Sequence, residues 1–352
     1  LGLVGSEMCI RDRLYSDIKP NPTIENVQHG VAEFKAYGAD CIVAIGGGSS
    51  MDTSKAIGII INNPEFEDVR SLEGVAPTKN KCVPIIAVPT TAGTAAEVTI
   101  NYVVTDVERK RKFVCVDAHD IPVVAVVDPD MMSTMPASLT AATGMDALTH
   151  AIEAYVSTVA SPYTDALAMK AIEMVTAYLP SSYNGNRESR AAMHDAQCLA
   201  GMAFSNALLG IVHSMAHKTG AAFHEGSMKD RHLPHGCANA IYLPFVIKYN
   251  AHDGRAAERY ADIARMLGLP GNSNKGLIEN LCALIDKMND ELNIPHTLKE
   301  FGVDEAEFNA KVDEIAVNAV GDACTGSNPR AIDPATMAKL FKCTYYGTEV
   351  DF

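Results

Sequence analysis

Five side chains in this sequence could together hold a divalent metal ion: Asp146, His150, His213, His217 and His235. The first two are four residues apart, as are His213 and His217, so on a helix each pair would share one face. Carboxylate and imidazole ligands without a thiolate suit Fe, Zn, Ni or Mn. Such a set with one open position is typical of a catalytic metal.

A simpler interpretation applies to each pair on its own. A histidine on an apolar helix face is usually a core residue whose hydrogen bonds are satisfied, and a spacing of four arises by chance. Both pairs, however, lie in Ala-, Gly- and Met-rich segments that read as helical, and Pro234-His235-Gly236 follows. The combination favours a metal site.

The predicted secondary structure that must position these residues changes near residue 135. Before it, short β-branched runs alternate with helical stretches. Strands are predicted over residues 40–45, 83–88 and 123–127, and helices over 24–37 and 52–61. Apolar strands that alternate with helices indicate a parallel sheet covered on both faces. We therefore predict an α/β dinucleotide-binding domain over residues 14–135.

From residue 136 to residue 352 the β-branched runs stop and an all-α domain is predicted. Its expected helices cover residues 139–157, 163–179, 190–217, 239–249, 256–267, 275–292 and 334–345. Asp333 should cap the last one, with Pro334 at its first position. All the metal candidates fall in this helical domain.

A glycine loop, residues 46–50, follows the first strand and opens a helix. Glycines let the backbone approach a ligand, and a helix N-terminus offers free N–H groups to an anion. The second strand also ends in a hydroxyl-rich segment, residues 90–97, and α/β sheets bind ligands at this edge. Lys112 could neutralise a phosphate. A plain strand-to-helix turn is the alternative, because the loop matches neither common glycine fingerprint.

Composition narrows the classes of partner. The chain has 352 residues, 47% of them hydrophobic, which is enough for two domains with cores. The net charge of −14 argues against nucleic acid and against anionic membrane surfaces. No apolar run approaches the roughly 18 residues that span a bilayer. Nine scattered cysteines without a C-x-x-C pair read as buried free thiols of a cytoplasmic protein.

Five blocks of this chain resemble the signatures of the iron-dependent (group III) alcohol dehydrogenases. They are Gly46-Gly-Gly-Ser-x-x-Asp-x-x-Lys55, Pro89-Thr-Thr-Ala-Gly-Thr-x-x-Glu97, Gly144-x-Asp-Ala-Leu-x-His-Ala-x-Glu153, Gly210-x-x-His-x-Met-Ala-His217 and Pro234-His-Gly236. The resemblance runs from about Leu14 to the C-terminus. Residues 71–74, 99–102 and 111–117 are most similar to the lactaldehyde-reducing members, and residues 322–330 are shared with butanol dehydrogenase-like members.

The resemblance implies an enzyme that transfers hydride between NAD(H) and a short-chain alcohol or diol, with lactaldehyde and 1,2-propanediol favoured and NADP(H) left open. It implies Fe²⁺, with Zn²⁺ possible, on Asp146, His150, His213 and His235, and His217 as the catalytic proton relay. The implied cofactor contacts are Asn21, Gly47, Gly48, Ser49, Asp52, Thr90, Thr91, Thr94 and Lys112. The implied substrate contacts are Asn101, Phe204 and Cys324. It also implies a homodimer.

Two segments depart from the family pattern. Residues 7–13 back-translate to the transposon end that is ligated to DNA in sequencing libraries, so we expect residues 1–13 to be an assembly scar. The nucleotide domain would then be incomplete at its start, where the residue that selects NAD over NADP usually lies. Residues 225–232 read as an inserted surface loop. This loop contains His232, which could compete with His235 as a metal ligand. His235 is preferred because it keeps the Pro-His-Gly context.

Three rival functions remain at this stage. A dehydroquinate synthase-like enzyme would need a basic pocket, and the segments around Phe204 and Cys324 are apolar. A butanol- or glycerol dehydrogenase-like enzyme would differ in substrate or metal. A filament or scaffold subunit would resemble the bifunctional aldehyde–alcohol dehydrogenases, but this chain has no aldehyde dehydrogenase half.

Overall fold

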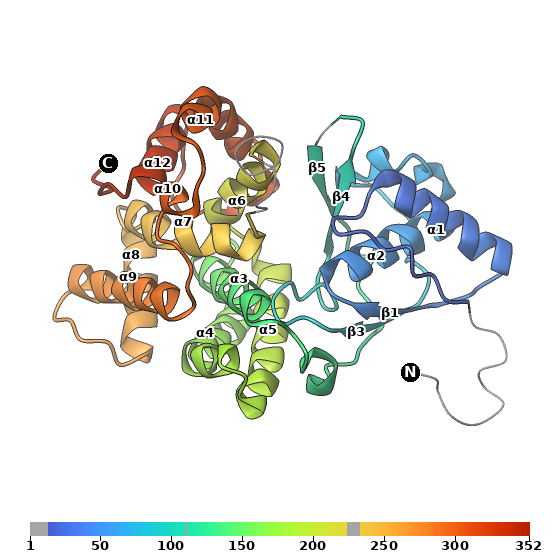
Figure 1. The fold of residues 1–352 in the computed structure, drawn as a ribbon, viewed down its shortest axis with the longest axis horizontal. Helices are drawn as coiled ribbons and strands as arrows, with labels where there is room; N and C mark the ends of the chain where they lie inside the picture. The colour runs from blue at the N-terminus through green and yellow to red at the C-terminus, as the bar shows by residue number, and fades with distance from the viewer. Residues whose placement is uncertain (1–12, 110, 224–232) are drawn as a thin grey trace.

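The computed structural model describes residues 13–109, 111–223 and 233–352, which form an α/β half and a helical half (Figure 1). Each half has its own hydrophobic core. Residues 1–12 of the expected scar and the expected insertion at 225–232 lie outside the described residues. The α/β plus all-α organisation predicted from the sequence is confirmed.

The central sheet of the N-terminal half is parallel, with strand order β1-β3-β6. The strands are β1 (Ile42–Gly46), β3 (Ile85–Pro89) and β6 (Val124–Ala125), and the helices are α1 (Ile24–Tyr37) and α2 (Gly48–Asn62). Thr23 caps α1 by accepting the N–H of Asn26, and Gly38 ends it in the left-handed region, with φ 70°. The three predicted strands and both predicted helices are therefore present.

One face of this sheet departs from the prediction of two covered faces. The helix α2 packs on one face, where Ala44 and Ala87 are buried. On the other face the side chains of Val43 and Ile45 are 56% and 57% exposed. Within the described residues, the expectation of cover on both faces is therefore wrong.

A second, mixed sheet was not anticipated. Its order is β2-β5-β4, from β2 (Gly74–Val75), β4 (Asn101–Asp106) and β5 (Arg111–Val116), and β4 and β5 pair antiparallel. Two 3-10 helices, η1 (Pro64–Phe66) and η2 (Val69–Leu72), lead into it. Along β4, Tyr102 and Val104 are buried and alternate with half-buried residues, which is the period of a strand with one face on the core.

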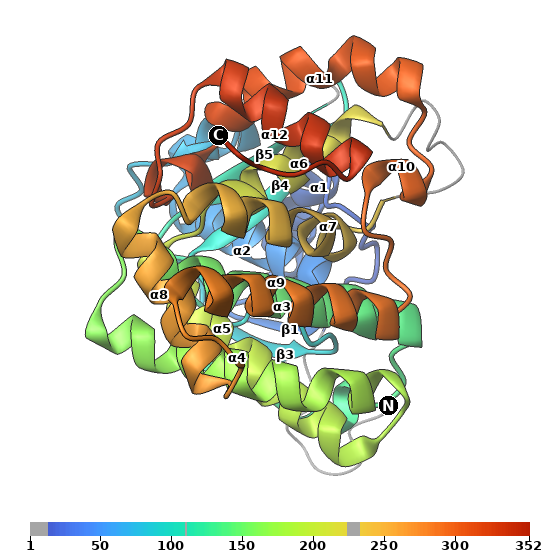
Figure 2. The ribbon, with the colours of Figure 1, turned by 90° about the vertical axis from the view of Figure 1, so that its left-hand side faces the viewer.

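The C-terminal half is a stack of helices, which Figure 2 shows face on. They are α3 (Ala137–Val156), α4 (Pro162–Tyr183), α5 (Arg187–Ala207), α6 (Ile211–Ala222), α7 (His235–Asn250), α8 (Gly254–Met266), α9 (Asn274–Glu291), α10 (Leu298–Phe301), α11 (Glu305–Val320), the 3-10 helix η4 (Ala323–Ser327) and α12 (Pro334–Tyr346). No helix was predicted from the sequence over α10 or α11. Asp333 caps α12 as predicted, because its side chain accepts the N–H of Thr336 at 2.7 Å.

The single helix expected over residues 190–217 is wrong. The chain breaks after Ala207, where Leu208 has a φ of 62°, and α6 leaves α5 at a bend of 104°. Among the described residues no single helix is long and apolar enough to cross a membrane. The bent pair of α5 and α6 would pass that test, on length and composition alone.

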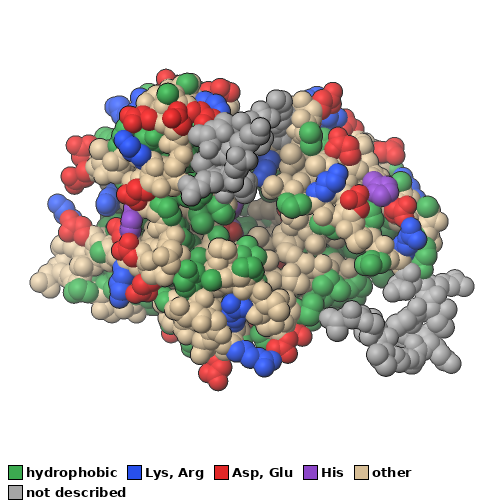
Figure 3. Space-filling view, in the orientation of Figure 1, with side chains coloured by type: hydrophobic (Ala, Val, Ile, Leu, Met, Phe, Trp, Pro, Cys, Tyr) green, Lys and Arg blue, Asp and Glu red, His purple; other side chains and the backbone are tan. Residues whose placement is uncertain are grey.

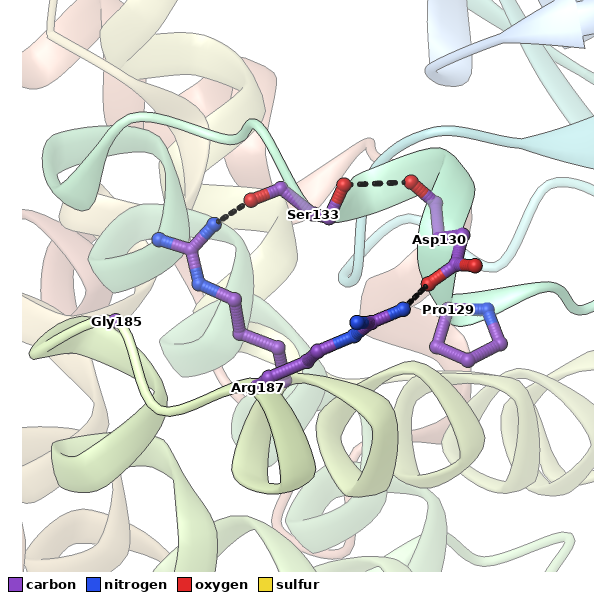
Figure 4. A pocket seen from close by; sticks show the side chains of 6 residues that line it. Pro129, Asp130, Ser133, Gly185 and Arg187 are labelled. Carbon is purple, nitrogen blue, oxygen red and sulfur yellow. Dashed lines mark hydrogen bonds and ion pairs between the residues drawn. The ribbon is translucent and has the colours of Figure 1, made fainter.

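The connection between the halves runs through η3 (Pro129–Met132) and is held by two arginines of α5 (Figure 4). Arg190 donates to the carbonyl oxygens of Ser133, at 2.5 Å, and Met135, at 3.0 Å. Arg187 pairs with Asp130. These side chains line a pocket of about 360 Å³ that contains none of the predicted site residues. Its arginines are already engaged, so we assign it to the linker rather than to chemistry.

Candidate active site

Three of the four predicted metal ligands lie around a carboxylate oxygen of the fourth. Asp146 Oδ1 lies 3.5 Å from His213 Nε2, 3.7 Å from His235 Nε2 and 3.8 Å from His150 Nε2. Four ligands at about 2.1 Å from a metal in a tetrahedron are separated by about 3.4 Å. The donor types and the distances from Asp146 suit one divalent ion. The ligand atoms of Asp146, His150 and His213 also lie within 4.8 Å of one another, a group that does not include His235.

Three helices bring these ligands together. Asp146 and His150 lie one turn apart on α3, His213 lies on α6, and His235 is the first residue of α7. The start of α7 approaches α3 closely, because a Cβ on Gly236 would lie 1.9 Å from the carbonyl oxygen of Ala142. Only glycine fits there, so Gly236 is what lets His235 reach Asp146.

The charges of the four ligands are tightly coupled. Burial lowers the pKa of His150 to about 4 and that of His235 well below its ordinary value, so both imidazoles are neutral near pH 7. Burial would raise the pKa of Asp146, but the neighbouring histidines hold it well below its usual range. Neutral imidazole and ionised carboxylate are the forms that bind a metal.

His213 differs because a second carboxylate faces it. Burial would lower the pKa of His213, yet Glu153 and Asp146 raise it to about 9. Glu153 Oε2 lies 2.5 Å from His213 Nδ1, and its Oε1 accepts the N–H of Val212 at 2.7 Å. Glu153 thus orients the ring so that Nε2 points at Asp146. In the sequence, Glu153 ends one of the family-like blocks without an assigned role, and its spacing of seven residues from Asp146 was the available signal.

Asn239 is a site residue that the sequence analysis missed. It lies one turn after His235 on α7, and its Nδ2 donates to Asp146 Oδ1 at 2.7 Å. The same Nδ2 lies 3.2 Å from the Nε2 atoms of His213 and His235. Asn239 therefore contacts three of the four candidate ligands. The i,i+4 spacing from His235 was the only sequence signal.

His217 lies beside the metal candidates but outside their group. Its ring stacks on His235, with centroids 5.2 Å apart, and its Nδ1 lies 3.3 Å from Asp322 Oδ2. Lys218 Nζ is 2.7 Å from the same oxygen. Burial would raise the pKa of Asp322, but His217 and Lys218 hold it well below its usual range. The ionised Asp322 can therefore accept a hydrogen bond from His217 Nδ1.

One of the three predicted substrate contacts borders the metal candidates, and a second lies beside His217. Phe204 stacks on His150 with centroids 4.3 Å apart, and Cys324 groups with His217 and Asp322. Burial raises the pKa of the Cys324 thiol well above its ordinary value, so it is not a nucleophile at neutral pH. Asn101 opens β4, and its Oδ1 is buried without a hydrogen-bond partner among the described residues.

The predicted cofactor contacts gather at the strand ends of the N-terminal half. A Cβ on Gly47 would lie 3.0 Å from Thr91 Cγ2, and one on Gly48 would lie 3.1 Å from Thr94 Cγ2. The loops after β1 and β3 therefore face each other. The backbone N–H of Thr90 donates to the carbonyl oxygen of Gly46 at 2.9 Å and joins the two loops directly.

Asn21 and Lys112 join this group from two other segments, through Ser49 of the glycine loop. The Asn21 N–H donates to Ser49 Oγ at 3.3 Å, and Lys112 Nζ donates to Asn21 Oδ1 at 2.7 Å. Asp52 behaves differently: its Oδ2 accepts the N–H of Val103 at 3.2 Å, and burial raises its pKa to about 7. Asp52, a predicted cofactor contact, thus has a hydrogen-bond partner in β4.

The two halves meet around a hollow that is visible in the space-filling view (Figure 3). On the helical side, α6 contacts β5 of the N-terminal half. The helix α6 carries His213 and His217, and β5 carries Lys112. The elements that carry metal candidates and a cofactor candidate are therefore in contact at this junction.

Comparison with family models shows to which protein family this chain belongs. Residues 140–345 match the model of the C-terminal part of the Fe-containing alcohol dehydrogenase family, and residues 6–129 match that of iron-containing alcohol dehydrogenase. The chain belongs to the iron-containing alcohol dehydrogenase family. The resemblance inferred from the five sequence blocks is thereby confirmed. As a member of this family, the chain is an NAD(P)-dependent oxidoreductase of alcohols and aldehydes.

Curated family members cover most of the chain. An NADPH-dependent butanol dehydrogenase from Clostridium saccharobutylicum is 51% identical, over 98% of this chain and 87% of that protein. A lactaldehyde reductase from Escherichia coli strain K12 is 49% identical, over 93% of this chain and 83% of that protein. Among solved structures, a 1,3-propanediol oxidoreductase is 40% identical with a TM-score of 0.86, covering 94% of this chain and 84% of that one.

Proposed function

We propose that this chain reduces short-chain aldehydes, and oxidises the alcohols in reverse, at one divalent metal held by Asp146, His150, His213 and His235. Fe²⁺ is the first candidate and Zn²⁺ the alternative, because both accept this ligand set. The observation that carries the proposal is the convergence of three imidazole Nε2 atoms on Asp146 Oδ1 at 3.5 to 3.8 Å.

When bound, the metal polarises a carbonyl oxygen and the nicotinamide supplies a hydride to the carbonyl carbon. The chain's own residues must then position the substrate and move one proton. His217 is proposed as the proton relay. With its Nδ1–H directed at Asp322, its Nε2 is left to exchange a proton with the substrate oxygen directly or through water. Phe204 covers the face of His150 and limits access of water to the reacting centre.

The proposed cofactor is NAD(H), with NADP(H) as the alternative. The facing loops after β1 and β3, the start of α2 and Lys112 form a site for a pyrophosphate, since they combine free N–H groups, hydroxyls and one cation. Of the two relatives described above, one is NADPH-dependent by name, which favours testing both cofactors. Burial lowers the pKa of Lys112. A bound phosphate would restore a counter-charge beside it.

The proposed substrates are small aldehydes and diols. Lactaldehyde with 1,2-propanediol is the first candidate and butanal with butanol the second, following the two similar enzymes. Phe204, which stacks on His150, and Cys324, which lies beside His217, offer apolar surface that suits C2 to C4 substrates. A cytoplasmic homodimer belongs to the same proposal and rests on the family resemblance.

The test uses anaerobically purified full chain, stripped with a chelator and reloaded with Fe²⁺ or Zn²⁺. Oxidation of NADH and of NADPH is followed with lactaldehyde and with butanal. We expect metal-restored turnover that His213→Ala lacks and that His252→Ala, a change at an exposed histidine, retains. A wild-type chain that holds metal and cofactor but turns over neither aldehyde would contradict the proposal.

A further inference from the structure

The loop of residues 90–100, here the bridging loop, joins β3 to β4 and belongs to both hydrophobic cores. Ala92 and Ala95 are 3% and 1% exposed and pack in the core of the helical half, whereas Ala96 is buried in the core of the α/β half. A loop that is buried in two cores cannot shift relative to one without disturbing the other. It is therefore a mechanical connection between the halves, separate from the linker at η3.

The α/β half holds the end of this loop through a buried lysine. Lys55 of α2 is fully buried, and its Nζ donates to the carbonyl oxygens of Thr99 and, at 3.0 Å, Asn101. Asp120 Oδ1 lies 3.7 Å from the same Nζ. Burying an ammonium is costly unless it is well paired, so Lys55 fixes the end of the loop firmly to α2.

The helical half holds the loop through α5. Gln197 Nε2 donates to Glu97 Oε1 at 2.5 Å, and both side chains are almost fully buried. The N–H of Ile100 also donates to Ser205 Oγ at 3.1 Å. The approach is so close that a Cβ on Gly201 would lie 2.2 Å from the Cβ of Ala95. Two polar contacts and one close packing contact thus set the position of the loop on α5.

The bridging loop and α5 each lead to one of the two candidate binding sites. The bridging loop begins with Thr90, Thr91 and Thr94, which face the glycine loop. On α5, Phe204 lies two turns after Gln197 and stacks on His150. A shift of the loop along α5 would therefore change the position of Thr90, Thr91 and Thr94 relative to Phe204 and the His150 ring on which it stacks.

We propose that Glu97 and Gln197 are positioning residues: their buried hydrogen bond holds the bridging loop against α5 and so sets the distance from the nicotinamide to the substrate carbon. The inference rests on the function proposed above. It predicts that breaking the bond impairs hydride transfer while each half still binds its own ligand. Misplacement of reacting groups by about 1 Å costs on the order of 100-fold in rate.

The test compares Glu97→Ala and Gln197→Ala with the exchanged pair, Glu97→Gln with Gln197→Glu, which can remake the hydrogen bond in the opposite sense. For each variant, kcat, the primary isotope effect with deuterated reduced cofactor, the cofactor Kd and the bound metal are measured. We expect each alanine variant to lose roughly 10- to 100-fold in kcat with a larger isotope effect, while cofactor Kd and bound metal change by less than about threefold. The exchanged pair should recover most of the kcat.

A second variant tests the same distance without removing a polar group. Gly201→Ala pushes α5 away from Ala95 and should reproduce the fall in kcat and the larger isotope effect. Gly276→Ala on α9, where the nearest atom is 3.6 Å away, is the matched control and should behave as wild type. If the alanine variants at Glu97 and Gln197 fail to fold, the comparison of Gly201→Ala with Gly276→Ala tests the inference in their place.

Three results would overturn the inference. One is a wild-type kcat and isotope effect in Glu97→Ala. Another is an exchanged pair no better than the single variants. The third is a fall in bound metal or cofactor affinity that accounts for the whole loss of rate. An inactive wild-type chain would instead count against the proposed function, so the two failures are distinguishable.

Discussion

His213 and Glu153 form a buried pair in which His213 Nδ1 lies 2.5 Å from Glu153 Oε2. The opposite ring nitrogen of His213, Nε2, lies 3.5 Å from Asp146 Oδ1. One imidazole therefore links a carboxylate outside the candidate ligand set to the carboxylate inside it. Such a partner raises the basicity of the ligand and keeps its metal-binding nitrogen aimed at the site.

Glu153→Gln tests this relationship. The amide oxygen can still accept one hydrogen bond, but the negative charge on the far side of His213 is lost. We expect the affinity for Zn²⁺ or Co²⁺ to fall by about 10- to 100-fold. Competition with a coloured chelator measures it. Glu173→Gln, a change at an exposed residue paired with Lys170, is the control and should leave affinity unchanged. Equal affinities in the two variants would contradict the role given to Glu153.

Asp322→Asn should separate proton relay from metal binding. The change removes the charge that faces both His217 and Lys218, so His217 keeps at most a neutral amide oxygen as the acceptor for its Nδ1–H. We expect kcat to fall by roughly 10- to 100-fold, within the range of general acid–base contributions, while bound metal stays at the wild-type level. Asp262→Asn, at a half-buried residue of α8 paired with Arg265, is the control. Loss of metal in step with kcat would argue against a relay.

The ion pair between Arg70 and Asp106 should make stability depend on pH in the acid range. Arg70 Nε lies 2.6 Å from Asp106 Oδ2 and lowers the pKa of that carboxyl to about 2, from an ordinary value of 3.8. Because the folded-state pKa is depressed, the contribution is complete above the unfolded pKa and disappears as pH falls through the folded one. Asp106→Asn should therefore destabilise the chain in urea at pH 7 and matter progressively less from pH 4 to pH 2. A difference that is constant across this window would show that the charge is not its origin.

Gly236→Ala should displace the start of α7. Its added Cβ would collide with the carbonyl oxygen of Ala142, which is backbone and cannot rotate away. We expect a loss of about 1 to 3 kcal/mol in the free energy of unfolding, typical of overpacking, together with weaker metal binding as His235 moves. Urea unfolding and metal titration measure the two effects. Gly254→Ala, which meets no atom within 4 Å at the start of α8, should show neither.

The candidate metal ligands could be proposed from the sequence because their signal is local. Asp146 with His150, and His213 with His217, show the i,i+4 spacing that a single helix imposes, and the helices around them have the apolar period that predicts them. The glycine loop after β1 was found for the same reason, as a strand, a turn and a helix in direct succession. His235 was singled out by its Pro234-His235-Gly236 context, and the family resemblance then gave it the role of fourth ligand.

Contacts between distant segments were decided only by the tertiary structure. The hydrogen bond between Glu97 and Gln197 joins residues 100 positions apart. The contact of Glu153 with His213 depends on how α6 packs on α3. The pairing of β4 with β5 and the break at Leu208 were likewise invisible, since propensity does not show which turns the packed core imposes. Periodicity determines which face of an element is buried. The neighbour that covers this face is chosen by close packing of the whole chain.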